Sequence, residues 1–168
     1  APVRLEQTIE ALRSADADVI LLQEVERVDP ARGQVRPPPN FSRLAEALED
    51  YDSFFAYPPE DERELTLGYG LAIFARTELT DEEIIELPAP DLAFEFGGET
   101  TRPTRRILTG ARTVIGGSTV QLFNTHLQAF FVLGENSDRF PEQREVVARR
   151  LRESRLPTLL GGDFNSAP

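Results

Sequence analysis

The sequence predicts a mixed α/β layered sandwich, in which mixed β-sheets are flanked by helices. Amphipathic helical patterns alternate with short apolar runs that are typical of strands, and two strand-like runs flank a pair of glycines that is typical of a hairpin. The 168 residues correspond to about one domain, residues 1–168, and the 40% hydrophobic and 28% charged residues are typical of a globular chain.

Composition excludes several classes of protein. The 18 basic residues are all arginine and stand against 29 acidic ones, so the net charge is −11, which disfavours a broad surface for nucleic-acid phosphates. The longest apolar runs have five residues, far fewer than the roughly 18 of a membrane-spanning helix. The absence of cysteine excludes disulfides, thiolate metal sites and a cysteine nucleophile. The compartment and the oligomeric state stay open.

A helix and a strand are expected first. Leu5, Ile9 and Leu12 recur at i, i+4 and i+7, which predicts an amphipathic helix that ends near Asp16. The continuous apolar run at residues 19–22 predicts a short strand that is buried on both faces.

A second helix and two more strands are expected in the middle of the chain. Residues 29–40 contain three consecutive prolines and are expected to form a loop, after which Asn40 is expected to cap a helix. Apolar runs at residues 54–56 and 71–74 predict strands. Prolines and glycines interrupt residues 77–104, for which we expect a loop or an irregular edge.

The last third of the chain predicts a hairpin, a helix and a final strand. The runs at residues 107–115 and 119–123 flank two adjacent glycines, which accept the positive φ of a tight turn. A helix is expected to start near Pro141, and residues 156–160 are expected to form the last strand.

Three of the expected strands end in side chains that can bind a metal ion or a phosphate. Ligands of α/β proteins gather outside the carboxyl ends of strands. The side chains concerned are Glu24, Asn124 with His126, and Asp163 with Asn165.

Glu24 is the candidate metal ligand. A carboxylate at the end of a buried strand is costly unless it is paired, hydrated or bound to a cation. Mg²⁺ favours one or two carboxylates and keeps several waters, which suits this position. The alternative is a solvated strand end or an ion pair between Glu24 and Arg27.

Asp163, Asn165 and His126 are the candidate catalytic residues. Asp163 and Asn165 are two residues apart, so in an extended segment both point the same way and can orient a water and a phosphoryl oxygen. The alternative is an ordinary turn, since this sequence is rich in turn formers. His126 is the only histidine, and its N–H can stabilise charge on a phosphoryl oxygen; the alternative is a structural role.

Substrate binding is assigned to Arg105, Arg106 and Asn124. Arginine holds phosphate through paired hydrogen bonds, so the two adjacent arginines can hold an anionic substrate. The alternative for either arginine is an exposed structural ion pair.

Four segments, in order along nearly the whole chain, resemble the endonuclease/exonuclease/phosphatase family of metal-dependent phosphohydrolases, which has the DNase I-like fold. Together they are highly specific; they are residues 18–24, 68–76, 123–127 and 160–165. The resemblance implies Mg²⁺ or Mn²⁺ as cofactor with Glu24 as ligand, His126 in contact with the phosphate, and Asp163 with Asn165 positioning water and substrate.

The sequence departs from the family pattern in the middle and at the ends. Leu71 stands where the family commonly has Asn, so no polar role is expected there. A first strand with a metal-binding Asn and a final Asp-His pair are not in the sequence. We therefore expect the domain to be incomplete at both ends, and residues 1–168 alone to be inactive.

The expected function is Mg²⁺-dependent hydrolysis of a phosphodiester or phosphomonoester by in-line attack of an activated water. The alternative is a non-catalytic binding or regulatory module with the same fold. The negative net charge and four phenylalanines near the expected site favour a small-molecule or lipid-like phosphoester over nucleic acid, unless those rings lie in the core. The rings are Phe94, Phe96, Phe130 and Phe131.

Overall fold

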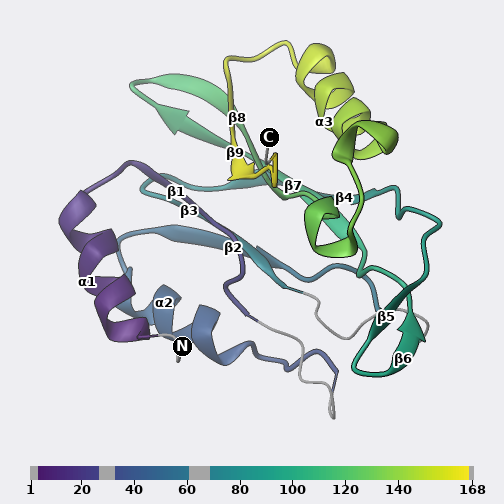
Figure 1. The fold of residues 1–168 in the computed structure, drawn as a ribbon. Helices are drawn as coiled ribbons and strands as arrows, with labels where there is room; N and C mark the ends of the chain where they lie inside the picture. The colour runs from purple at the N-terminus through teal and green to yellow at the C-terminus, as the bar shows by residue number, and fades with distance from the viewer. Residues whose placement is uncertain (1–3, 27–32, 61–68, 167–168) are drawn as a thin grey trace.

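Two β-sheets pack face to face between two layers of helices. The computed structural model describes residues 4–26, 33–60 and 69–166. Helices α1 and α2 lie outside one sheet and α3 lies outside the other, as Figure 1 shows. The predicted layered α/β sandwich is confirmed. None of the helices in the described ranges has the length and apolar content that crossing a lipid bilayer requires.

The first sheet has the strand order β1-β3-β2 with antiparallel pairing throughout. Its strands are β1 (Val19–Leu22), β2 (Asp52–Ala56) and β3 (Leu71–Ala75), and its helices are α1 (Leu5–Ala15) and α2 (Pro39–Ala47). Every residue of the central strand β3 is buried, because helices cover one face and the second sheet covers the other.

Strand β1 forms where the apolar run predicts it, but it is less buried than expected. Ile20 packs beneath the helices and Leu21 packs between the sheets, so both faces are covered. Only Ile20 is fully buried, because β1 lies at the edge of the first sheet among the described residues.

Helix α2 begins differently from the prediction, since Pro38 and not Asn40 is the N-cap. A proline is favoured in the first turn because its φ is already helical and it needs no hydrogen-bond acceptor. Asn40 instead binds Glu26: its backbone N–H donates to Oε2 at 2.7 Å and its Nδ2 donates to Oε1 at 3.0 Å. The carboxylate of Glu26 therefore accepts a hydrogen bond from a backbone N–H in the first turn of α2 that has no acceptor within the helix.

The second sheet has the order β4-β7-β8-β9 and is mixed, because β8 and β9 are parallel. Its elements are β4 (Thr80–Leu87), β7 (Arg106–Ile115), β8 (Ser118–His126), β9 (Thr158–Asp163) and the covering helix α3 (Glu142–Glu153). The expected hairpin is confirmed as β7 and β8, and both of its turn glycines have positive φ. The last strand lies about two residues later than expected and includes Asp163.

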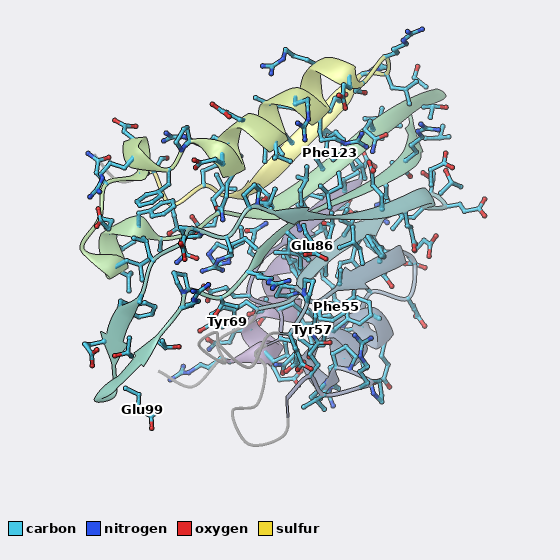
Figure 2. The ribbon with its side chains drawn as sticks, turned by 90° about the vertical axis from the view of Figure 1, so that its right-hand side faces the viewer. Phe55, Tyr57, Tyr69, Glu86, Glu99 and Phe123 are labelled. Carbon is cyan, nitrogen blue, oxygen red and sulfur yellow. The ribbon has the colours of Figure 1, made fainter. Side chains whose placement is uncertain are left out.

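For residues 77–104, the alternative of an irregular edge holds for β4, which lies at the edge of its sheet and shifts register between Thr80 and Glu83, but the expectation of a loop is wrong, because the segment contains three strands. These are β4, β5 (Phe94–Phe96) and β6 (Glu99–Thr101). Strand β4 is rich in acidic residues that disfavour strands, but pairing with β7 buries Leu87 and overrides this local preference. Strands β5 and β6 form a hairpin that projects from the body, with Glu99 at its tip in Figure 2.

Two glycines in β9 let three strands approach one another closely. A Cβ on Gly161 would lie 2.6 Å from Leu21 Cδ1 in β1, and one on Gly162 would clash with the carbonyl oxygen of Thr125 in β8. Because both positions lack a side chain, β9 fits between β1 and β8, and the ends of these strands come together.

We expect Gly162→Ala to lower the free energy of unfolding by on the order of 2–3 kcal/mol, because the new methyl group collides with backbone. The control is Gly116→Ala, which also adds a Cβ at positive φ but has nothing within 4 Å. That change should cost about 1 kcal/mol from backbone strain alone. Urea unfolding followed by circular dichroism measures both, and equal losses would contradict the close packing at Gly162.

Candidate active site

The ends of β1, β8 and β9 bring three titratable side chains together. His126 Nε2 lies 3.9 Å from Oε1 of Glu24 and 3.8 Å from Oδ2 of Asp163. The parallel register pairs His126 directly with Asp163, while Glu24 follows β1 with a left-handed φ of 54°. Both carboxylates are about half exposed, at 53% and 52%, whereas the imidazole is buried. The convergence predicted from the strand ends is therefore present.

His126 has a defined hydrogen-bonding state. Arg106 Nη1 lies 3.3 Å from Nδ1 of His126, and a guanidinium only donates, so Nδ1 accepts and the ring proton resides on Nε2. Burial, and after it the charge of Arg106, lower the pKa of His126 to about 4, against the opposing effect of Asp163. At pH 7 the ring is neutral and directs an N–H toward the two carboxylates.

Asp163 and Asn165 form a turn at the end of β9. The backbone N–H of Asn165 donates to Oδ1 of Asp163 at 2.9 Å, and Asn165 has a left-handed φ of 46°. The side chain of Asn165 donates to the carbonyl of Leu127 at 2.8 Å. The turn that the sequence left as an alternative is thus present, and it fixes one oxygen of Asp163 while the other faces His126.

The two adjacent arginines point to different partners. Arg106 lies behind His126 and also donates to Oε1 of Gln128 at 3.4 Å. The pKa of Arg106 is lowered, because burial outweighs the opposing effect of the nearby Glu24, Tyr69 and Asp163. Arg105 turns toward β4, where its Nη1 lies 3.5 Å from Oε2 of Glu86. Of the pair, the structure brings Arg106 to the site.

Asn124 is completely buried, with 0% of its surface exposed. Its Nδ2 donates to the carbonyls of Leu22 at 2.9 Å and Ala72 at 3.0 Å, and its Oδ1 accepts from Gln23 Nε2 at 2.7 Å. The structure does not bring this side chain to the surface of the site. It joins the two sheets directly beneath the cluster instead.

Sequence reasoning did not single out Gln23, Gln128 and Tyr69. Gln23 holds the amide of Asn124, Gln128 accepts from Arg106, and the ring of Tyr69 lies 6.4 Å from the ring of His126. The available signals were the position of Gln23 beside Glu24 and the position of Tyr69 in the family-like segment 68–76. Leu71 is buried and takes no polar role, as expected.

The four phenylalanines expected near the site have different surroundings. Phe130 is buried, Phe131 is 55% exposed, and Phe94 is half-buried in β5. The side chain of Phe96 lies outside the described part of the structure. The alternative of a core position therefore holds for Phe130.

The carboxylates fit a hydrated divalent cation better than a cage made of protein alone. Among the described residues, no group of three or more His, Cys, Asp or Glu side chains is placed to hold a metal ion. Mg²⁺ needs only one or two carboxylates and completes its shell with water and substrate oxygens. Glu24 and Asp163 are hard oxygen donors, and their partial exposure leaves room for that water.

The sequence profile of the Endonuclease/Exonuclease/phosphatase family matches residues 1–168. The chain belongs to this family. The resemblance predicted from the sequence is therefore confirmed, and the matched range includes Glu24, His126 and Asp163. The comparison with curated protein sequences finds no match.

Solved structures of family members share the fold. A protein from Beutenbergia cavernae DSM 12333 has a TM-score of 0.68 at 24% identity and is matched over 98% of this chain and 43% of its own. TDP2 from D. rerio complexed with single strand DNA product has a TM-score of 0.64 at 21% identity, and the match covers 98% of this chain and 54% of that one. The human Nocturnin catalytic domain with bound sulfate has a TM-score of 0.62 at 21% identity, and the match covers 98% of this chain and 57% of that one. The chain spans about half the length of these structures.

We expect Asn124→Leu to lower the free energy of unfolding by about 2–4 kcal/mol, because two buried carbonyls lose their donor. The same substitution at the exposed Asn136 should cost about 1 kcal/mol or less. Urea unfolding of both variants measures the difference. A loss at Asn124 no larger than that at Asn136 would show that the amide does not hold the sheets together.

We expect Arg106→Met to relax the tautomer of His126, because Nδ1 loses its donor. His126 is the only histidine, so nitrogen NMR of the imidazole gives one pair of ring signals. In the wild type Nδ1 should be fully unprotonated; in the variant the two nitrogen shifts should move toward each other. Arg112→Met is the control, since Arg112 lies in the same strand but pairs with Asp81. Identical spectra for all three proteins would contradict the assignment.

Proposed function

We propose that this chain forms the part of a Mg²⁺-dependent phosphoesterase that binds the phosphoryl group and activates water. The observation that carries the proposal is the convergence of Glu24, His126 and Asp163 at three strand ends. Membership of the family supports it. Hydrolysis of phosphoesters by an activated water is the reaction that this combination of groups performs best.

Each residue has a distinct task in this proposal. Glu24 holds the cation, which when bound neutralises charge that develops on the phosphoryl oxygens. Asp163 orients the attacking water and accepts its proton through the oxygen that the turn leaves unengaged. His126 donates its Nε2–H to a phosphoryl oxygen, which stabilises that oxygen most strongly in the transition state.

Arg106 and Asn165 support these groups. Arg106 keeps the proton of His126 on Nε2 and adds a positive charge behind the site. Asn165 is held by Leu127, and its backbone N–H fixes Asp163, so it places the base relative to the phosphate. Preorganised donors of this kind need no rearrangement during the reaction.

The substrate class has two candidates. A small or lipid-like phosphoester suits the net charge of −11, which repels an extended polyanion. Single strand DNA is the product bound to TDP2 from D. rerio, so the comparisons do not favour the small substrate. We propose the small or lipid-like phosphoester on the strength of the charge and of the aromatic surface described below.

In the phosphoesterase of which this chain forms part, we expect Asp163→Asn to lower kcat by on the order of 10²–10⁴ while KM changes little, because loss of a general base acts in the transition state. Hydrolysis of a panel of small phosphoesters and of single-stranded DNA with Mg²⁺ supplies the rates. Asp81→Asn, a matched change remote from the cluster, is the control and should retain activity. A raised KM with intact kcat would assign Asp163 to substrate binding instead of catalysis.

A further inference from the structure

Two cavities of about 270 and 550 Å³ border the segment that follows Asp163. The smaller is lined by Phe164, the larger by Asn165, and both by Ser166. They also share Phe130, Ser137 and Arg144, so they form two parts of one depression. We call this the aromatic depression. It lies directly beside the turn that fixes the base.

The smaller part of the aromatic depression is walled mainly by apolar side chains. Phe130 stacks on Phe140 with ring centroids 4.8 Å apart and an interplanar angle of 5°. Phe164, also in the wall, remains 39% exposed, and Phe131 in the larger part is 55% exposed. Exposed apolar surface of this kind is typical of a ligand-binding groove.

The charges around the aromatic depression select against a polyanion. Arg144 lines both parts and contacts Asp138 Oδ1 and Ser137 Oγ only at 3.4 Å. Glu135 and Asp138 line the larger part and are paired with Arg139 at 2.5 Å and with Arg144 at 3.4 Å. These two arginines are therefore already engaged and attract successive phosphates of a nucleic-acid strand only weakly. A single uncharged ring needs no such charge.

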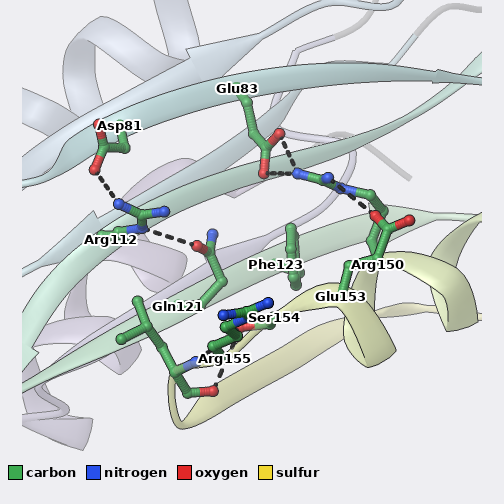
Figure 3. Close-up of a pocket in the computed structure, with 10 residues that line it drawn as sticks. Asp81, Glu83, Arg112, Gln121, Phe123, Arg150, Glu153, Ser154 and Arg155 are labelled. Atoms are coloured by element: carbon green, nitrogen blue, oxygen red, sulfur yellow. Dashed lines mark hydrogen bonds and ion pairs between the residues drawn. The ribbon is translucent and has the colours of Figure 1, made fainter.

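A third cavity, of about 430 Å³, lies over the outer face of the second sheet and has paired charges (Figure 3). Arg112 donates to Asp81 at 2.6 Å, and Arg150 binds both oxygens of Glu83 at 2.5 and 2.6 Å. These carboxylates already engage one terminal nitrogen of each of the two arginines, while Nε of Arg150 is buried without a hydrogen-bond partner in the described part of the chain. The aromatic depression is the cavity with an exposed apolar wall next to the candidate active site.

We propose that the aromatic depression receives the ester group of the substrate, and that this group is a flat aromatic ring. The inference rests on the proposed function, which places the phosphoryl group at Asp163. A cavity of about 150 Å³ admits benzene, so the smaller part of the depression has room for one substituted ring. Phe130, Phe140 and Phe164 line this part and supply the apolar surface for the ring, and Arg144 lines it as well.

Binding of two phosphate monoesters tests this proposal without relying on turnover. Phenyl phosphate and methyl phosphate share the phosphate and differ in the ring. In the presence of Mg²⁺, calorimetric titration of the wild type should give about tenfold tighter binding of phenyl phosphate, since the ring buries apolar surface.

Ser137→Trp fills space beside the wall that both parts share. It should reduce the ratio of phenyl phosphate affinity to methyl phosphate affinity from about ten to about one, with methyl phosphate affinity unchanged. Ser118→Trp is the matched control, at the exposed first residue of β8, and should keep the tenfold preference. Phe164→Ala is a second variant, at an exposed ring in the wall of the smaller part, and it should lower the ratio of phenyl phosphate to methyl phosphate affinity severalfold if Ser137→Trp fails to fold.

The outcomes separate the two proposals. Equal affinity of the wild type for both phosphates would overturn the aromatic depression as a subsite and leave the proposed function standing. Failure of both phosphates to bind would overturn the proposed function, and the subsite with it. A short single-stranded oligonucleotide that binds more tightly than phenyl phosphate, with the advantage lost in Ser137→Trp, would show that a nucleobase occupies the depression and overturn the small-substrate inference.

Discussion

The buried amide of Asn124 is the interaction on which the arrangement of the site depends. It donates to carbonyls of β1 and β3 in one sheet while its own strand, β8, belongs to the other. A buried amide is tolerated only when its donors and acceptor are paired, and Gln23 supplies the remaining partner. Because the amide of Asn124 must keep its hydrogen bonds, β8 is held at a fixed position relative to β1. His126 and Glu24, which end these strands, are thereby held beside each other.

The third strand depends on the absence of side chains. Gly161 and Gly162 let β9 lie against Leu21 and Thr125, and the parallel register then sets Asp163 beside His126. The site therefore depends on the hydrogen bonds of Asn124 between the two sheets and on the missing side chains at Gly161 and Gly162. Neither feature contacts the phosphate in the proposed reaction, yet both determine the distances between the groups that do.

Much of this was predictable from the sequence, for physical reasons that differ between segments. The strand at 19–22, the glycine hairpin and the convergence of Glu24, His126 and Asp163 follow from local apolar patterns and from the rule that ligands gather at strand ends. Strand β4 was missed because pairing with β7 overrides its acidic sequence. The burial of Asn124 was missed because a side chain beside His126 is equally consistent with an exposed and an inter-sheet position.

The central proposal is that Glu24 holds a divalent cation beside His126 and Asp163, and Mn²⁺ tests it most directly. Mn²⁺ is paramagnetic and broadens NMR signals close to it, and His126 provides the single histidine signal of the chain. We predict that substoichiometric Mn²⁺ broadens the imidazole signals of the wild type and that Glu24→Gln abolishes the effect, while Glu10→Gln on α1 does not. Unbroadened signals in the wild type, or equal broadening in Glu24→Gln, would contradict the claim.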